Sequence, residues 1–194
     1  MKASKSVVFA VLAVMGVMFA PASFAHTFDA HGVGFSGGLA HPFLGLDHLL
    51  AMVAVGLWAA QLGGSNLWRV PVAFVSAMAG GAVLANPFMD VSWLETAIAA
   101  SVVALGLMVA FRLRLPGLLG MLAVACFALF HGFAHGLEMP QTAWPLGYSL
   151  GFVLATASLH AAGILFGLAL GRGRFALQAG GAAIAAVGLL MIAA

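Results

Sequence analysis

The side chains of this 194-residue chain that could do chemistry are histidines and acids set within apolar stretches. One stretch reads LAHPFLGLDHLLAMVAVG and contains His41, Asp47 and His48. His41 and His48 are seven residues apart, which places them within about 20° of one face of a helix. Asp47 lies about 100° around the helix from His48, so the two could bind one ion only where the helix is distorted. Pro42 is a source of distortion, because proline removes a backbone donor.

A second stretch reads FHGFAHGLEMP and contains His131, His135 and Glu138. The two histidines are four residues apart, so a helix aims both imidazoles at one point. Glu138 continues the same stripe. Such a pair can also serve as polar glue between helices. However, several ionisable groups on two apolar helices are typical of an ion pathway, because each is costly inside a membrane. The two stretches together predict metal binding, either at one shared site or at two successive sites.

The ligand types narrow the choice of ion. Imidazole nitrogen suits zinc, copper, iron and nickel, and a carboxylate adds a harder oxygen ligand. Magnesium and calcium prefer a cage of oxygens. A single cysteine, Cys126, excludes a thiolate pair, although the ten methionines keep copper open. The residues therefore indicate a borderline divalent transition metal and do not rank nickel, cobalt and zinc.

Other polar residues lie outside these two motifs. His26, Asp29 and His31 follow the N-terminal apolar segment and form a candidate external metal-capture segment. His160 stands alone in its apolar stretch, which is more typical of a hydrogen-bonded packing residue. Met52 lies on the same face as His48, one turn further along, and is more typical of core than of a ligand.

The composition is that of an integral membrane protein. Hydrophobic residues make up 64% of the chain and charged residues 6%, and the mean hydropathy is +1.15. A soluble domain is about 45–50% apolar and about 25% charged. A soluble enzyme, a nucleic-acid-binding protein and a disordered chain are therefore excluded. The apolar runs are continuous rather than alternating, which favours helices over a membrane barrel. We expect an all-α polytopic membrane protein with the lipid bilayer as its partner.

The N-terminus has the order of a secretory signal peptide. Lys2 and Lys5 precede an apolar run over 7–20, and Ser23 and Ala25 form a small-x-small cleavage signature. We expect residues 1–25 to be removed, which leaves 26–194 as a single transmembrane domain. The alternative is an uncleaved first transmembrane helix.

Apolar runs between breakers then predict six spanning helices after the signal peptide. Their expected bounds are Ser36–Leu62, Val70–Ala85, Trp93–Phe111, Leu115–Leu137, Trp144–Leu170 and Phe175–Ala193. The basic residues of the mature chain all fall in alternate connections, whereas the other segments carry only acids. The positive-inside rule therefore predicts that both ends of the mature chain lie outside the cytoplasm.

Both histidine motifs resemble those of the HupE/UreJ family of bacterial nickel and cobalt permeases. HPFLGLDHLLAMVAVGLWA and FHGFAHGLE carry the likeness, which extends over essentially the whole chain. It implies a non-enzymatic secondary permease in the cytoplasmic membrane, without a prosthetic group, whose substrate is Ni²⁺ or Co²⁺. The family is often associated with the maturation of hydrogenase or urease, so metal-handling maturation proteins are expected partners. The family's motif residues correspond here to His41, Asp47, His48, His131, His135 and Glu138.

Two other classes of function use the same residue types. A membrane haem protein uses paired histidines on two helices as axial ligands and transfers electrons. An intramembrane zinc-dependent hydrolase uses histidine and aspartate to hold zinc around an activated water. A haem needs neither two histidines on each stretch nor an acid beside His48. A hydrolase needs a segment outside the membrane to bind its substrate, and we find none in the sequence.

Overall fold

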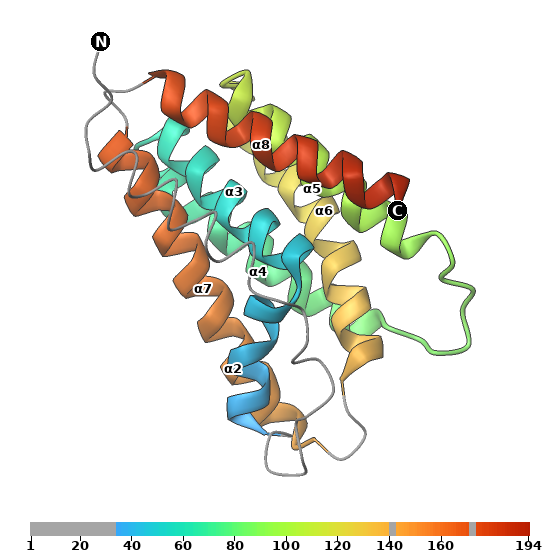
Figure 1. Ribbon diagram of the computed structural model, residues 1–194. Coiled ribbons are helices and arrows are strands. Elements are labelled where there is room, and N and C mark those ends of the chain that lie inside the picture. The colour runs from blue at the N-terminus through green and yellow to red at the C-terminus, as the bar shows by residue number, and fades with distance from the viewer. Residues whose placement is uncertain (1–33, 140–142, 171–173) are drawn as a thin grey trace.

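The computed structural model describes residues 34–139, 143–170 and 174–194, and the regular secondary structure of this part is all helix (Figure 1). The expected all-α class is therefore confirmed. The signal peptide and the candidate capture residues His26, Asp29 and His31 lie outside the described residues. The seven helices in this part are α2 (Phe35–Leu44), α3 (Leu46–Leu62), α4 (Asn66–Leu84), α5 (Leu94–Ala110), α6 (Gly117–Glu138), α7 (Pro145–Leu170) and α8 (Arg174–Ala193).

Several of these helices are long and apolar enough to cross a membrane. Helices α4, α6, α7 and α8 each qualify, and α2 with α3 makes a fifth candidate if the pair is one span. Helix α5 is apolar but has only 17 residues, fewer than the 20 or so that a straight span needs. All six expected segments are helical. One boundary prediction is wrong: Arg69 lies in the first turn of α4 rather than in a connection, with its guanidinium 5.5 Å from the centre of the Trp68 ring.

The first expected span is not one helix. Helices α2 and α3 meet at an angle of 83°, and the break is at Gly45, whose backbone is extended (φ −90°, ψ 117°). The prediction placed the distortion at Pro42, but this proline lies inside α2 and the helix continues past it for two residues. His41 and His48 therefore lie on different helices, and the prediction that they share one helical face is wrong.

The helices pack as a bundle around α3, whose middle portion is almost fully buried. The most extensive pairings are α4 with α6, α5 with α8, and α7 with both α2 and α3. Gly132 shows why α4 and α6 can approach so closely, since a Cβ at this position would overlap the backbone carbonyl of Met78. Small residues are a usual means of close helix packing in membranes. This contact holds α4 directly beside the FHGFAHGLE motif.

The connections divide the bundle into two ends. Helices α3, α5 and α7 finish at one end, where α4, α6 and α8 begin, and the chain there carries its arginines. We call this the arginine end. The opposite end carries Asp90, Glu95 and Glu138, and we call it the acidic end.

Candidate metal site

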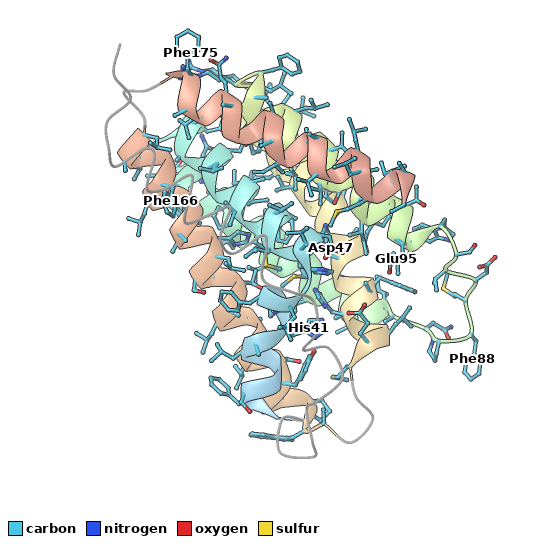
Figure 2. All side chains as sticks on the ribbon, in the orientation of Figure 1. His41, Asp47, Phe88, Glu95, Phe166 and Phe175 are labelled. Atoms are coloured by element: carbon cyan, nitrogen blue, oxygen red, sulfur yellow. The ribbon has the colours of Figure 1, made fainter. Side chains whose placement is uncertain are left out.

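The four histidines of the two motifs form one cluster at the junction of α2, α3 and α6. The His48 and His135 ring centres are 4.1 Å apart, His48 and His131 are 4.8 Å apart, and His41 and His135 are 4.9 Å apart. His48, His131 and His135 are buried, whereas the His41 side chain is 30% exposed. The labelled His41 and Asp47 lie where α2 and α3 face α6 (Figure 2). The bend at Gly45 makes this possible, because it turns α2 so that its histidine also meets α6.

His41, His135 and Glu138 form the outer part of the cluster, toward the acidic end. The Glu138 Oε2 atom lies 3.2 Å from His41 Nε2 and 3.6 Å from His135 Nδ1. One potential ligand atom from each residue lies within 4.8 Å of the other two. The Glu138 side chain is 45% exposed, the His41 side chain 30% and the His135 side chain 5%, so Glu138 is the most accessible member of this group. Two imidazoles and a carboxylate are a plausible ligand set for a borderline divalent metal.

Asp47 and His48 form the inner part with His131. The Asp47 carboxylate accepts a hydrogen bond from His48 Nδ1 at 2.7 Å and another from the His48 backbone at 2.8 Å. Because a carboxylate only accepts, Nδ1 carries the proton and the free lone pair is on Nε2. Asp47 therefore fixes the orientation of the ring and leaves Nε2 ready to bind a cation, as carboxylates do beside metal-bound histidines.

Ser101 on α5 does the same for His131. Its hydroxyl donates to the Ile98 carbonyl at 2.6 Å and lies 2.8 Å from His131 Nε2. Since the hydroxyl proton is already used, His131 Nε2 must be the donor and Nδ1 has the free lone pair. The sequence reasoning missed Ser101. The available signal was a hydroxyl within the apolar run AIAASVVALG, but its partner lies 30 residues away.

Aromatic residues of α7 close the cluster on one side. The Phe152 ring centre is 4.1 Å from that of His135 and 6.0 Å from that of His41. The Tyr148 ring centre is also 6.0 Å from that of His41. Both rings are buried and exclude lipid from the site. The sequence analysis did not single out either residue, because aromatic residues are common in apolar helices.

Four ring nitrogens of the cluster have no hydrogen-bond partner among the described residues. They are His48 Nε2, His131 Nδ1 and both nitrogens of His135. A buried polar atom without a partner is destabilising and uncommon. These nitrogens lie close together, and the hydrogen bonds to Asp47 and Ser101 leave lone pairs on His48 Nε2 and His131 Nδ1. A bound cation would satisfy them.

Comparison with known proteins shows which family the chain belongs to. The family model described as HupE / UreJ protein matches residues 12–191. The chain belongs to the HupE/UreJ family. The curated Protein HupE of Rhizobium leguminosarum bv. viciae is 46% identical over 164 residues, which cover 84% of this chain and 86% of that protein. No solved structure matches the chain. The family resemblance expected from the two histidine motifs is confirmed.

The two residues expected to be packing residues differ in outcome. Met52 is fully buried in the main core cluster, as expected. His160 is also buried, and its ring packs edge-on against Phe74, with 5.3 Å between the ring centres. However, neither of its nitrogens has a hydrogen-bond partner among the described residues. The expected packing of His160 is confirmed, whereas the expected hydrogen bond is not found among the described residues.

Proposed function

We propose that this protein is a secondary permease that imports a divalent transition metal ion, nickel or cobalt, across the bacterial cytoplasmic membrane. The observation that carries the proposal is the meeting of four histidines and two acids from α2, α3 and α6 in an apolar bundle, with unpartnered nitrogens on neighbouring rings. Membership of the HupE/UreJ family supports it. The ion is the transported substrate, and the maturation of a nickel enzyme such as hydrogenase or urease is its proposed use.

The proposed topology has six spans after removal of residues 1–25, within a single domain over 26–194. In this proposal the bent pair α2–α3 is the first span and α5 is a short span. The arginine end faces the cytoplasm, as the positive-inside rule requires. The acidic end and the capture residues His26, Asp29 and His31 face outward, so that the ion is collected where the carboxylates lie.

The ion first meets the outer group of His41, His135 and Glu138, where it exchanges part of its water for imidazole nitrogen and carboxylate oxygen. It then passes to His48 Nε2 and His131 Nδ1. The ligands come from three helices, so small helix movements change the number of ligands that reach the ion. This suits transport, which needs binding strong enough to capture the ion and weak enough to release it. Inward movement of a doubly charged ion gains about 4.6 kcal/mol per 100 mV of membrane potential.

The cluster favours this function over a haem protein. A haem has to lie between its two axial imidazoles, whereas the rings of His48 and His135 pack directly on each other with centres 4.1 Å apart. No observation on the described residues favours the zinc hydrolase.

Uptake of radioactive nickel and cobalt by cells that lack other importers tests the proposal. Cells expressing the protein should accumulate metal, and the His48→Ala and His131→Ala variants should lose accumulation while remaining in the membrane. The matched control is Ser158→Ala, which removes a hydroxyl that bonds only to its own helix, at the Ala155 carbonyl. Normal accumulation by both histidine variants would leave these residues as helix glue and refute the proposal.

A further inference from the structure

Helix α7 carries a pair of buried polar groups that the four-histidine cluster does not use. His160 is 2% exposed and Thr156, one turn earlier on the same helix, is 0% exposed. Neither His160 nitrogen, nor the Thr156 hydroxyl, has a hydrogen-bond partner among the described residues. The neighbouring Ser158 shows the usual alternative, since its hydroxyl donates to the Ala155 carbonyl at 2.6 Å.

Packing alone does not account for this pair. A leucine or phenylalanine would fill the same volume without leaving polar atoms buried and unpaired, which costs about 1–3 kcal/mol for each group. Hydroxyl and imidazole lie four residues apart, on one face of the helix. Two unsatisfied polar side chains at such a spacing point to a ligand that supplies the missing interactions.

Phe74 on α4 connects this pair to the four-histidine cluster. Its ring is fully buried, and its centre lies 5.9 Å from that of His131 and 5.3 Å from that of His160. The two histidines therefore contact the same aromatic ring. The ring offers no ligand atom of its own.

His160 also lies nearer the arginine end than the cluster does. At a rise of about 1.5 Å per residue it is about 22 Å along α7 from Pro145 but only about 15 Å from Leu170. It borders an open groove of about 370 Å³ between α4 and α7, whose lining is almost entirely apolar and includes Leu67 and Trp68 in the first turn of α4. This groove extends from His160 to the helix ends at the arginine end of the bundle.

We propose that His160 and Thr156 form a second binding station for the transported divalent ion, reached past Phe74 and nearer the arginine end. The inference rests on the proposed transport function. His160 supplies one imidazole nitrogen and Thr156 one hydroxyl oxygen, with water completing the coordination. Such a site binds more weakly than one built from several imidazoles, and this favours onward release of the ion.

The test compares substitutions that keep volume with one that keeps donor atoms. His160→Phe retains an aromatic ring against Phe74 but no nitrogen, His160→Gln retains polar atoms, and Thr156→Val replaces the hydroxyl by a methyl group. Initial rates of radioactive cobalt and nickel uptake give the maximal rate and KM in cells that lack other importers. Equilibrium dialysis of the detergent-purified protein with Co²⁺ gives the affinity of the four-histidine cluster.

We expect His160→Phe to lower the maximal uptake rate at least tenfold with little change in KM or in Co²⁺ affinity. The maximal uptake rate of His160→Gln should lie between those of His160→Phe and the wild type. Thr156→Val should lower this rate several-fold, and the control Ser158→Ala should leave it at the wild-type value. A merely structural role would instead lower Co²⁺ affinity or membrane abundance in all three variants, without restoration by Gln.

The outcomes separate this inference from the transport proposal. If the wild type takes up metal and His160→Phe reaches the same maximal rate, the second station is refuted and the transport function stands. If the wild type takes up no more metal than cells without the protein, both are refuted. If immunoblots show that His160→Phe does not reach the membrane, Thr156→Val becomes the test. A wild-type maximal uptake rate in Thr156→Val would then refute the second binding station.

Discussion

Replacement of Asp47 tests whether this acid acts through His48 rather than as a ligand of its own. Its carboxylate accepts a hydrogen bond from His48 Nδ1 at 2.7 Å, which leaves the lone pair on His48 Nε2, an atom without a partner among the described residues. Asp47→Asn keeps an oxygen that can accept this hydrogen bond but removes the negative charge. Asp47→Ala removes both the acceptor and the orientation of the ring.

The magnitude follows from the role of such partners. Loss of a hydrogen-bond partner of a metal-binding histidine typically costs 10- to 100-fold in metal affinity, which is about 1.4–2.7 kcal/mol. We expect metal affinity to fall about tenfold in Asp47→Asn and about 100-fold in Asp47→Ala. The loss is smaller in Asp47→Asn because the amide oxygen still positions the His48 ring. His48→Ala removes the ligand itself and should not be rescued by high metal.

The assay is initial nickel uptake over a concentration series that extends at least 100-fold above the wild-type KM. The Asp47→Asn curve should shift to higher nickel and approach the wild-type maximum. The matched control is Asp90→Asn, since Asp90 is exposed and its carboxylate accepts a hydrogen bond from the nearby Ser92 backbone at 3.0 Å. Wild-type KM in Asp47→Ala would refute the positioning role, and a complete loss in Asp47→Asn that high nickel cannot rescue would show that Asp47 binds the ion directly.

Three further predictions concern other parts of the molecule. Glu138→Gln should reduce uptake at low metal and be rescued at high metal, because it weakens capture of the ion at the outer group but leaves both imidazoles there; equal loss at every concentration would contradict this. Gly132→Ala should lower membrane abundance on immunoblots, since a Cβ there overlaps the α4 backbone, whereas Gly117→Ala, which meets nothing within 4 Å, should not; equal abundance would count against the packing. Reporter fusions should place Arg114 in the cytoplasm and Asp90 outside, and the reverse orientation would overturn the proposed topology.

The helices were predictable because continuous apolar runs between Gly, Pro and Asn breakers leave little choice of structure in a membrane. The meeting of the two histidine motifs was predictable for a similar reason: buried ionisable groups need partners, and the chain has few. The family resemblance added the identity of the motif residues, and the matches to known proteins agree with it.

The details that were not predictable depend on contacts between distant residues. The break between α2 and α3 is at Gly45 rather than at Pro42. The sequence shows a proline that can distort a helix, but the extended backbone at Gly45 depends on how α2 and α3 pack against the other helices. Ser101 was missed because its partner is on another helix. His160 was assigned a hydrogen bond on statistical grounds, and only the surrounding packing shows that none of the described residues provides one.

The break at Gly45 also sets the electrostatic character of the site. The last carbonyls of α2 and the first amides of α3 lack partners within their own helices, so two opposite helix dipole ends meet beside the histidine cluster. The carbonyl end attracts a cation, and the amide end repels it unless a negative charge compensates. Asp47, in the first turn of α3, supplies that charge. A side chain at position 45 would displace the Asp47 carboxylate or the His48 ring, because its Cβ would lie 2.9 Å from Asp47 Oδ1 and 3.0 Å from His48 Nδ1. The bend is therefore a means of adjusting how strongly a doubly charged ion is held without adding or removing a single ligand.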